Sequence, residues 1–237
     1  MIKNIIFDMD GTLINTNHER FDYLYLKYIF NKFKSMGYKY EDVSLIVASG
    51  ENKIRHNKGP LTNEELFIKH IKDNLDIEEN KLISLIKDFH NNEYNNLKKC
   101  VKKIEITRVM VEVLKEKGYN LIIATNPEFP KSAIEKRLEW GKIDRNLFSY
   151  ITSYENSHYC KPNEGYYKEI LKNNNIKADE TMMIGNDCFY DAAIEKIGIP
   201  CYIVTNYVRG KEYIDNCKLK GDYNDLMEFV MNLPKLN

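Results

Sequence analysis

The sequence predicts an α/β fold, a doubly wound, Rossmann-like parallel sheet with an inserted all-helical cap domain. Nearly continuous apolar runs at residues 2–7, 121–124, 182–184 and 201–204 are typical of parallel strands covered on both faces. Helical patterns separate the last three runs, and strands alternating with helices favour this architecture. Residues 15–101 break the alternation because they contain helical patterns and no convincing strand.

The expected elements follow in chain order. A weaker strand candidate covers residues 150–152. Expected helices cover residues 107–117, 131–140, 164–172 and 191–197, and glycines after the first, second and fourth of these suit helix ends. Within the inserted segment, residues 18–33 and 82–89 have helical patterns, and Thr62 with Glu65 and Asp76 with Glu79 match the signature of a helix start.

These boundaries predict two domains. Residues 1–15 and 102–237 would form the Rossmann-like core, and residues 16–101 would form the helical domain. The chain would cross between them at residues 14–16 and 99–103, which we expect to act as hinges.

Composition narrows the class of protein. Lys+Arg and Asp+Glu both total 35, and this balance argues against a nucleic-acid or membrane-surface binder. No segment approaches the length of a membrane span, and the apolar run at residues 2–7 is too short for a signal peptide. Five dispersed cysteines do not suggest disulfides or a zinc site. We therefore expect a cytoplasmic protein.

Two carboxylates follow the first apolar run, in the segment Asp8-Met9-Asp10-Gly11-Thr12-Leu13. Alternate side chains of an extended segment point the same way, so Asp8 and Asp10 should face one site. Ligands bind at the carboxyl edge of such sheets. Paired carboxylates there suit hard-cation binding, with one group able to attack while the other moves a proton.

Three further motifs follow in order at expected strand ends or in loops. Thr125-Asn126 ends an apolar run, Lys161-Pro162 precedes a helical pattern, and the segment of residues 185–191 carries Asp187 and Asp191. Each motif is weak alone, since such residues are common in turns and caps. Their joint occurrence in this order is strong evidence that the pattern is not a coincidence.

With these motifs the sequence resembles the haloacid dehalogenase superfamily, and its phosphatases in particular. The resemblance implies a magnesium ion held by Asp8, the Asp10 backbone carbonyl and Asp187, with Asp191 nearby orienting a metal-bound water or Lys161. It implies that Thr125, Asn126 and Lys161 bind the phosphoryl group.

The resemblance also implies a two-step reaction. Asp8 would attack phosphorus to form an aspartyl-phosphate, and Asp10 would act as general acid and then general base. Halide leaves without a proton, so Asp10 favours a phosphatase over a dehalogenase. The expected substrate is a small phosphorylated metabolite, and the protein would be a monomer or homodimer.

Other functions remain open. A sugar phosphomutase uses the same core, and a phosphonate-cleaving enzyme would need a cap lysine such as Lys53 or Lys58. A non-catalytic binding protein on the same fold is a third alternative.

The helical insert resembles the caps of this superfamily, which cover the active site. Within it, residues 49–60 are polar, basic and flanked by glycines, and we expect a loop there. Arg55, His56 and Lys58 are the candidate contacts with an anionic leaving group, although a solvated surface loop is the commoner explanation. The apolar stripe of Phe21, Leu24 and Tyr28 is expected to form the core of this domain.

Overall fold

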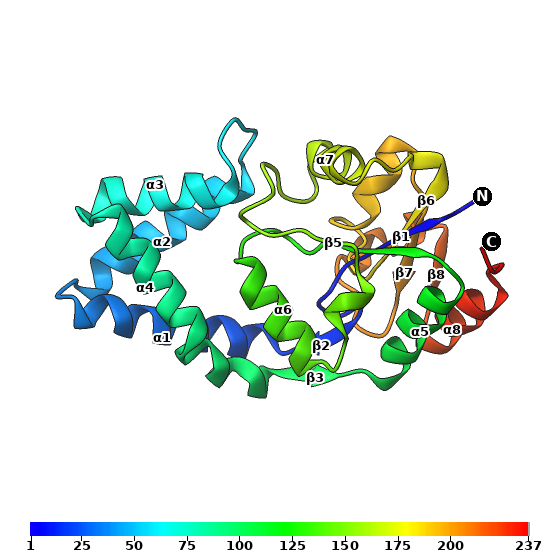
Figure 1. Ribbon diagram of the computed structural model, residues 1–237, viewed down its shortest axis with the longest axis horizontal. Helices are drawn as coiled ribbons and strands as arrows, with labels where there is room; N and C mark the ends of the chain where they lie inside the picture. The colour runs from blue at the N-terminus through cyan, green and yellow to red at the C-terminus, as the bar shows by residue number, and fades with distance from the viewer. Residues whose placement is uncertain (237) are drawn as a thin grey trace.

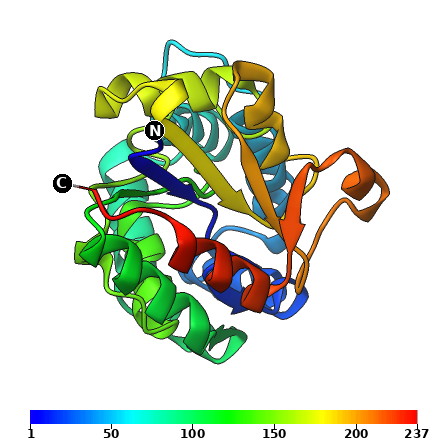
Figure 2. The same ribbon diagram turned by 90° about the vertical axis from the view of Figure 1, so that its right-hand side faces the viewer.

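A six-stranded parallel sheet forms the centre of the computed structural model, which describes residues 1–236 (Figure 2). Its strand order is β5-β4-β1-β6-β7-β8, which confirms the predicted α/β class. The strands are β1 (Asn4–Phe7), β4 (Asn120–Ile123), β5 (Tyr150–Ile151), β6 (Thr181–Gly185), β7 (Cys201–Val204) and β8 (Leu219–Gly221). The short edge strand β8 was not expected from the sequence.

Helices cover both faces of the sheet (Figure 2). Ile5 and Phe7 of β1 belong to the same buried cluster as residues of α5 (Glu105–Glu116) and α8 (Tyr223–Asn232). Ile6 belongs instead to the cluster that includes α7 (Glu164–Asn174) and the 3₁₀ helix η4 (Ala192–Ile197). This alternation is the two-residue period of a strand buried on both sides, which explains the continuous apolar runs in the sequence.

The inserted segment is helical and lies to one side of the sheet (Figure 1). It consists of α1 (His18–Ser35), α2 (Tyr40–Arg55), α3 (Asn63–Leu75), α4 (Glu79–Asn91) and the 3₁₀ helix η1 (Glu93–Cys100). Phe21 and Leu24 are buried, as the sequence indicates, whereas Tyr28 is only half-buried. The buried clusters of this segment and of the α5 face of the sheet are continuous.

The chain passes into and out of this segment through a two-stranded antiparallel ribbon. Strands β2 (Ile14–Thr16) and β3 (Val101–Lys103) pair along their whole length, with Ile14 opposite Lys103 and Thr16 opposite Val101. The two expected crossing points therefore lie side by side.

Several local predictions need correction. Residues 49–60 are not one loop, because α2 continues to Arg55 and Gly50 is buried in it against Phe67 and His70. Thr62 and Glu65 form the predicted capping box, but Asp76 ends α3 in the left-handed region, and Glu78 precedes α4. Residues 192–197 form 3₁₀ rather than α-helix.

Helix α6 (Lys131–Trp140) stands between the sheet and the inserted helices (Figure 1). It starts after Pro130 and ends at Gly141, as predicted. Short 3₁₀ turns complete the chain: η2 (Arg145–Leu147), η3 (Ala178–Glu180) and η5 (Lys211–Asn216). All five cysteines are free and buried. Across residues 1–236, no helix has both the length and the apolar character that a membrane crossing requires.

Candidate active site

Three strand ends meet at the carboxyl edge of the sheet. Phe7, the last residue of β1, pairs with Ile123 of β4 on one side and Ile184 of β6 on the other. The backbone N–H of Asp8 donates to the Ile184 carbonyl at 2.9 Å, and that of Ala124 donates to the Phe7 carbonyl at 2.7 Å. This register brings the first, second and fourth sequence motifs to one edge.

Lys161 joins two of the predicted site residues. Its Nζ lies 2.8 Å from Asp8 Oδ1 and 2.6 Å from Asp191 Oδ1, and its side chain is only 3% exposed. Burial alone would lower the pKa of Lys161, but the two carboxylates outweigh it and raise that pKa well above its usual value. The ammonium is therefore a permanent positive charge at the strand ends.

Asp8 carries a strongly perturbed carboxyl group. Burial raises its pKa to about 7, with Lys161 opposing the shift and Asp191 and Asp10 adding to it. The negative charge on Asp8 is thus incompletely compensated by the protein alone. Perturbation of this kind is common at functional sites.

Asp191 is fixed by hydrogen bonds to both of its oxygens. Oδ2 accepts from the backbone N–H groups of Asn186 at 2.9 Å and Asp187 at 3.0 Å, while Oδ1 accepts from Lys161. Gly185 makes room for this carboxylate, because a Cβ there would lie 2.3 Å from Asp191 Oδ2. Asp191 therefore holds Lys161 in place.

The loop after β4 is also held rigidly. The Thr125 carbonyl accepts hydrogen bonds from the Thr152 hydroxyl at 2.8 Å and the Tyr166 hydroxyl at 2.7 Å. The Asn126 side-chain oxygen accepts from the backbone N–H of Lys161 at 3.1 Å. The second and third motifs are thereby joined directly.

Asp10 has a partner that the sequence reasoning missed. Arg137 of α6 donates from Nη2 to Asp10 Oδ1, and the Thr16 hydroxyl donates to the same oxygen. The guanidinium also lies 4.8 Å from the ring centroid of Phe21 in α1. A signal was available, because Arg137 lies at helical spacing from the buried residues Ala133 and Ile134.

Arg55 pairs with acids other than Asp8 and Asp191. Its Nε donates to Glu128 Oε1 at 2.8 Å, and its side chain is half exposed. Glu128 follows Asn126 by two residues and accepts a hydrogen bond from its side-chain amide at 2.7 Å. Arg55 therefore connects the inserted helices to the loop after β4.

The remaining acid, Asp187, lies at the same sheet edge. Its Oδ1 accepts hydrogen bonds from the backbone N–H groups of Phe189 and Tyr190. Among residues 1–236, no three His, Cys, Asp or Glu side chains are clustered closely enough to hold a metal ion by themselves. A set of two carboxylates and a backbone carbonyl, with waters completing the shell, does not need such a cluster.

The fold and these strand ends define a class of enzyme. The sequence profile of the haloacid dehalogenase-like hydrolase family matches residues 5–204, and the chain belongs to this family. The sequence prediction of an enzyme of this class is confirmed.

Individual relatives are distant. The chain is 25% identical to pyrophosphatase PpaX of Bacillus mycoides over 236 residues, covering 100% of this chain and 99% of the relative. Among solved structures, it resembles a HAD phosphatase from Thermococcus onnurineus, with a TM-score of 0.61 and 16% identity over 99% of this chain and 100% of the other. It also resembles a predicted phosphatase from Clostridium acetobutylicum, with a TM-score of 0.59 and 21% identity over 98% and 100% of the two chains. At such identities the structures support the fold alone.

Proposed function

We propose that this protein is a magnesium-dependent phosphatase that hydrolyses small phosphorylated metabolites through an aspartyl-phosphate on Asp8. The observation that carries the proposal is the buried Lys161 ammonium 2.8 Å from Asp8 Oδ1, with Asp10 two residues further on. A phosphate ester is anionic and repels a carboxylate nucleophile, so a fixed positive charge beside the nucleophile is what this reaction needs.

The proposed chemistry has two steps. An oxygen of Asp8 attacks phosphorus, and the bond to the leaving oxygen breaks as Asp10 gives that oxygen a proton. Asp10 would have to carry this proton on Oδ2 at that stage, because Oδ1 accepts from Arg137 and Thr16. Asp10 then takes a proton from the water that attacks the aspartyl-phosphate, which releases phosphate and restores Asp8. Thr125, Asn126 and Lys161 would bind the phosphoryl oxygens during both steps.

The residues present fit a magnesium ion. Asp8, the Asp10 carbonyl and Asp187 offer oxygen ligands, which this cation prefers. The raised pKa of Asp8, caused mainly by burial, indicates a negative charge that a nearby divalent cation would compensate. When bound, magnesium would help to neutralise the transferring phosphoryl group. Both Asp191 oxygens already accept hydrogen bonds, so we assign Asp191 to holding Lys161.

We further propose that residues 16–101 act as a cap over the site. Thr16 and Phe21 of this segment contact the Asp10–Arg137 pair, and Arg55 binds Glu128 beside the second motif. Closure of such a segment excludes water from the reacting groups and adds contacts to the leaving group.

The test is a panel of phosphate monoesters, with pyrophosphate included, assayed for released phosphate with magnesium and with excess chelator. We expect release only with the metal, and its loss in Asp8→Asn. Asp179→Asn, an exposed acid in η3, is the control and should retain activity. Activity retained in Asp8→Asn would refute the nucleophile assignment. Transfer of phosphate to a sugar hydroxyl instead of water would favour the phosphomutase alternative.

A further inference from the structure

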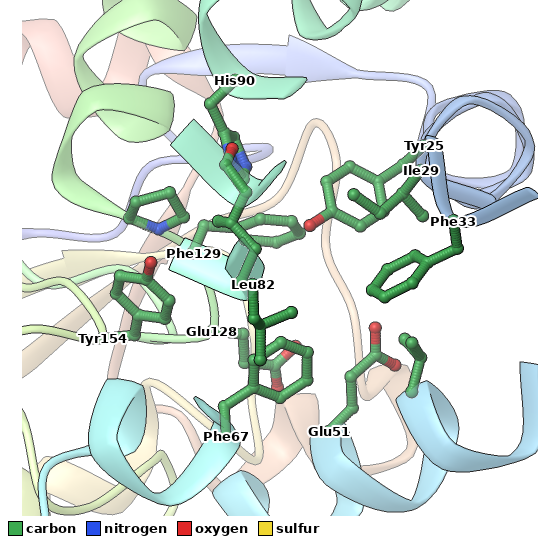
Figure 3. A pocket seen from close by; sticks show the side chains of 13 residues that line it. Tyr25, Ile29, Phe33, Glu51, Phe67, Leu82, His90, Glu128, Phe129 and Tyr154 are labelled. Atoms are coloured by element: carbon green, nitrogen blue, oxygen red, sulfur yellow. The ribbon is translucent and has the colours of Figure 1, made fainter. Parts of the chain in front are cut away.

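An apolar cavity lies between the inserted helices and the loops after β4 and β5 (Figure 3). Aromatic side chains from both sides line it, including Tyr25 of α1, Phe67 of α3, Phe129 and Tyr154. The cavity begins next to the second motif, because Glu128 and Phe129 in its wall follow Asn126 by two and three residues, and Glu128 accepts a hydrogen bond from the Asn126 side chain. A group bound there would lie on the cap side of the phosphate site.

The polar groups of this cavity offer negative charge and hydrogen-bond acceptors. Glu51 of α2 points its carboxylate into the cavity, between Phe33 and Phe67 (Figure 3). Its nearest ion-pair partner, Arg55 Nη2, is 3.9 Å from Glu51 Oε2, and that guanidinium is already bound to Glu128. Glu51 therefore has a carboxylate available to a ligand.

His90 gives an independent indication of a ligand. This cavity-lining residue of α4 is 3% exposed, and its Nδ1 lies 2.8 Å from the Ile86 carbonyl, so Nδ1 carries the proton. Nε2 is buried and has no hydrogen-bond partner within the described part of the chain. Burial lowers the pKa of His90 to about 4, so the ring is neutral near pH 7 and Nε2 is an acceptor that lacks a donor.

We infer that this cavity binds the primary ammonium group of an aminoalkyl phosphate whose ester bond is cleaved at Asp8. The inference rests on the proposed phosphatase function and specifies its substrate class. An ammonium supplies the N–H donors that Glu51 lacks, and its charge is attracted to the faces of the aromatic rings beside Glu51, Phe33 and Phe67 (Figure 3).

Other leaving groups fit the cavity less well. A second phosphate would meet Glu51 and Glu128 without a free cation, because Arg55, the cation beside them, is already bound to Glu128. A sugar presents many hydroxyl groups, each of which would need a polar partner among mainly apolar walls.

The test uses two nearly isosteric esters, 3-aminopropyl phosphate and butyl phosphate, which differ by an ammonium in place of a methyl group. We expect wild-type kcat/KM to favour the amine by about tenfold or more, as a partly desolvated ammonium held by aromatic rings and a carboxylate predicts. In Glu51→Gln this ratio should fall towards one. Glu41→Gln, on an exposed part of the same helix, should retain the wild-type ratio.

The outcomes separate this inference from the proposed function. Three results would overturn the inference while leaving phosphatase activity intact: a wild-type kcat/KM ratio near or below one, an unchanged ratio in Glu51→Gln, or a strong preference for pyrophosphate. If no ester releases phosphate, the proposed function fails. Calorimetric titration of Asp8→Asn with both esters then decides the inference, since preferential binding of the amine supports it and equal or absent binding overturns it.

Discussion

The pair between Arg137 and Asp10 gives the sharpest test of how the site is built. The Arg137 side chain is 4% exposed and that of Asp10 is 12% exposed. We would replace Arg137 with Met, which keeps an unbranched apolar stem and carries no charge, and Asp10 with Asn. The two single variants and the double variant complete a double-mutant cycle.

The expected magnitude follows from burial. Removing one partner of a buried ion pair costs about 3 to 5 kcal/mol, because the other charge is left uncompensated. Asp10 retains its hydrogen bond from Thr16, so we expect the lower end, about 3 kcal/mol, for Arg137→Met. Asp10→Asn should cost a similar amount by leaving the guanidinium buried. The double variant leaves neither charge, so its cost should fall short of the sum by about 2 kcal/mol or more.

The free energy of unfolding is measured by urea titration, followed by the fluorescence of Trp140, the single tryptophan, which lies in the same helix as Arg137. Arg145→Met is the control, because its ion pair with Glu135 is on the surface and should contribute about 1 kcal/mol or less. A coupling energy below about 0.5 kcal/mol between Arg137 and Asp10 would refute the reasoning, since contacting groups in one buried network should not be additive.

Two further predictions concern Gly185 and Glu51. Gly185→Ala places a Cβ 2.3 Å from Asp191 Oδ2, so Asp191 and with it Lys161 must shift. We expect phosphate release to fall by about a hundredfold or more with a stability cost of about 1 to 3 kcal/mol, and near wild-type turnover would contradict this. Burial raises the pKa of Glu51 from its usual 4.5 to about 7. Between these two pH values the folded protein keeps the Glu51 proton while the unfolded chain loses it, so the free energy of unfolding falls as pH rises. Glu51→Gln should therefore stabilise the protein by about 1 to 2 kcal/mol near pH 8 and by much less near pH 4.5. The figure for pH 8 is kept low because the Glu51 side chain is one-third exposed to solvent. Equal urea midpoint changes at both pH values would contradict it.

The parts of the fold that bury apolar runs were predictable from the sequence. Residues 121–124, 182–184 and 201–204 are apolar because both faces of those strands are covered, and each run closely matches an observed strand. Strand β8 is an exposed edge with Leu219 and Lys220 at the surface, so it leaves no apolar run to detect. The order of the motifs predicts that Asp8, Lys161 and Asp191 share one site, and the structure brings Lys161 into contact with both carboxylates. Their catalytic roles stay predictions.

Two features escaped the sequence reasoning for different reasons. In α2, Val43, Val47, Gly50 and Ile54 form a buried stripe. Its third member is a glycine with polar neighbours, so the sequence of residues 49–60 by itself favours a loop. Arg137 lies on the buried side of α6, where a charge is expensive unless paired. Its partner Asp10 is 127 residues away in sequence, and only the three-dimensional fold brings them together.

The ribbon of β2 and β3 has a consequence for how such a protein diversifies. Since the chain leaves and rejoins the sheet at neighbouring positions, the intervening helices can be lengthened, shortened or exchanged without disturbing the strand register that aligns Asp8. Selection on the inserted helices and selection on the sheet edge can therefore proceed separately. Contacts such as those of Thr16 with Asp10, Arg55 with Glu128 and Asn63 with Pro127 mark positions where a newly acquired insert would have to match the rest of the chain.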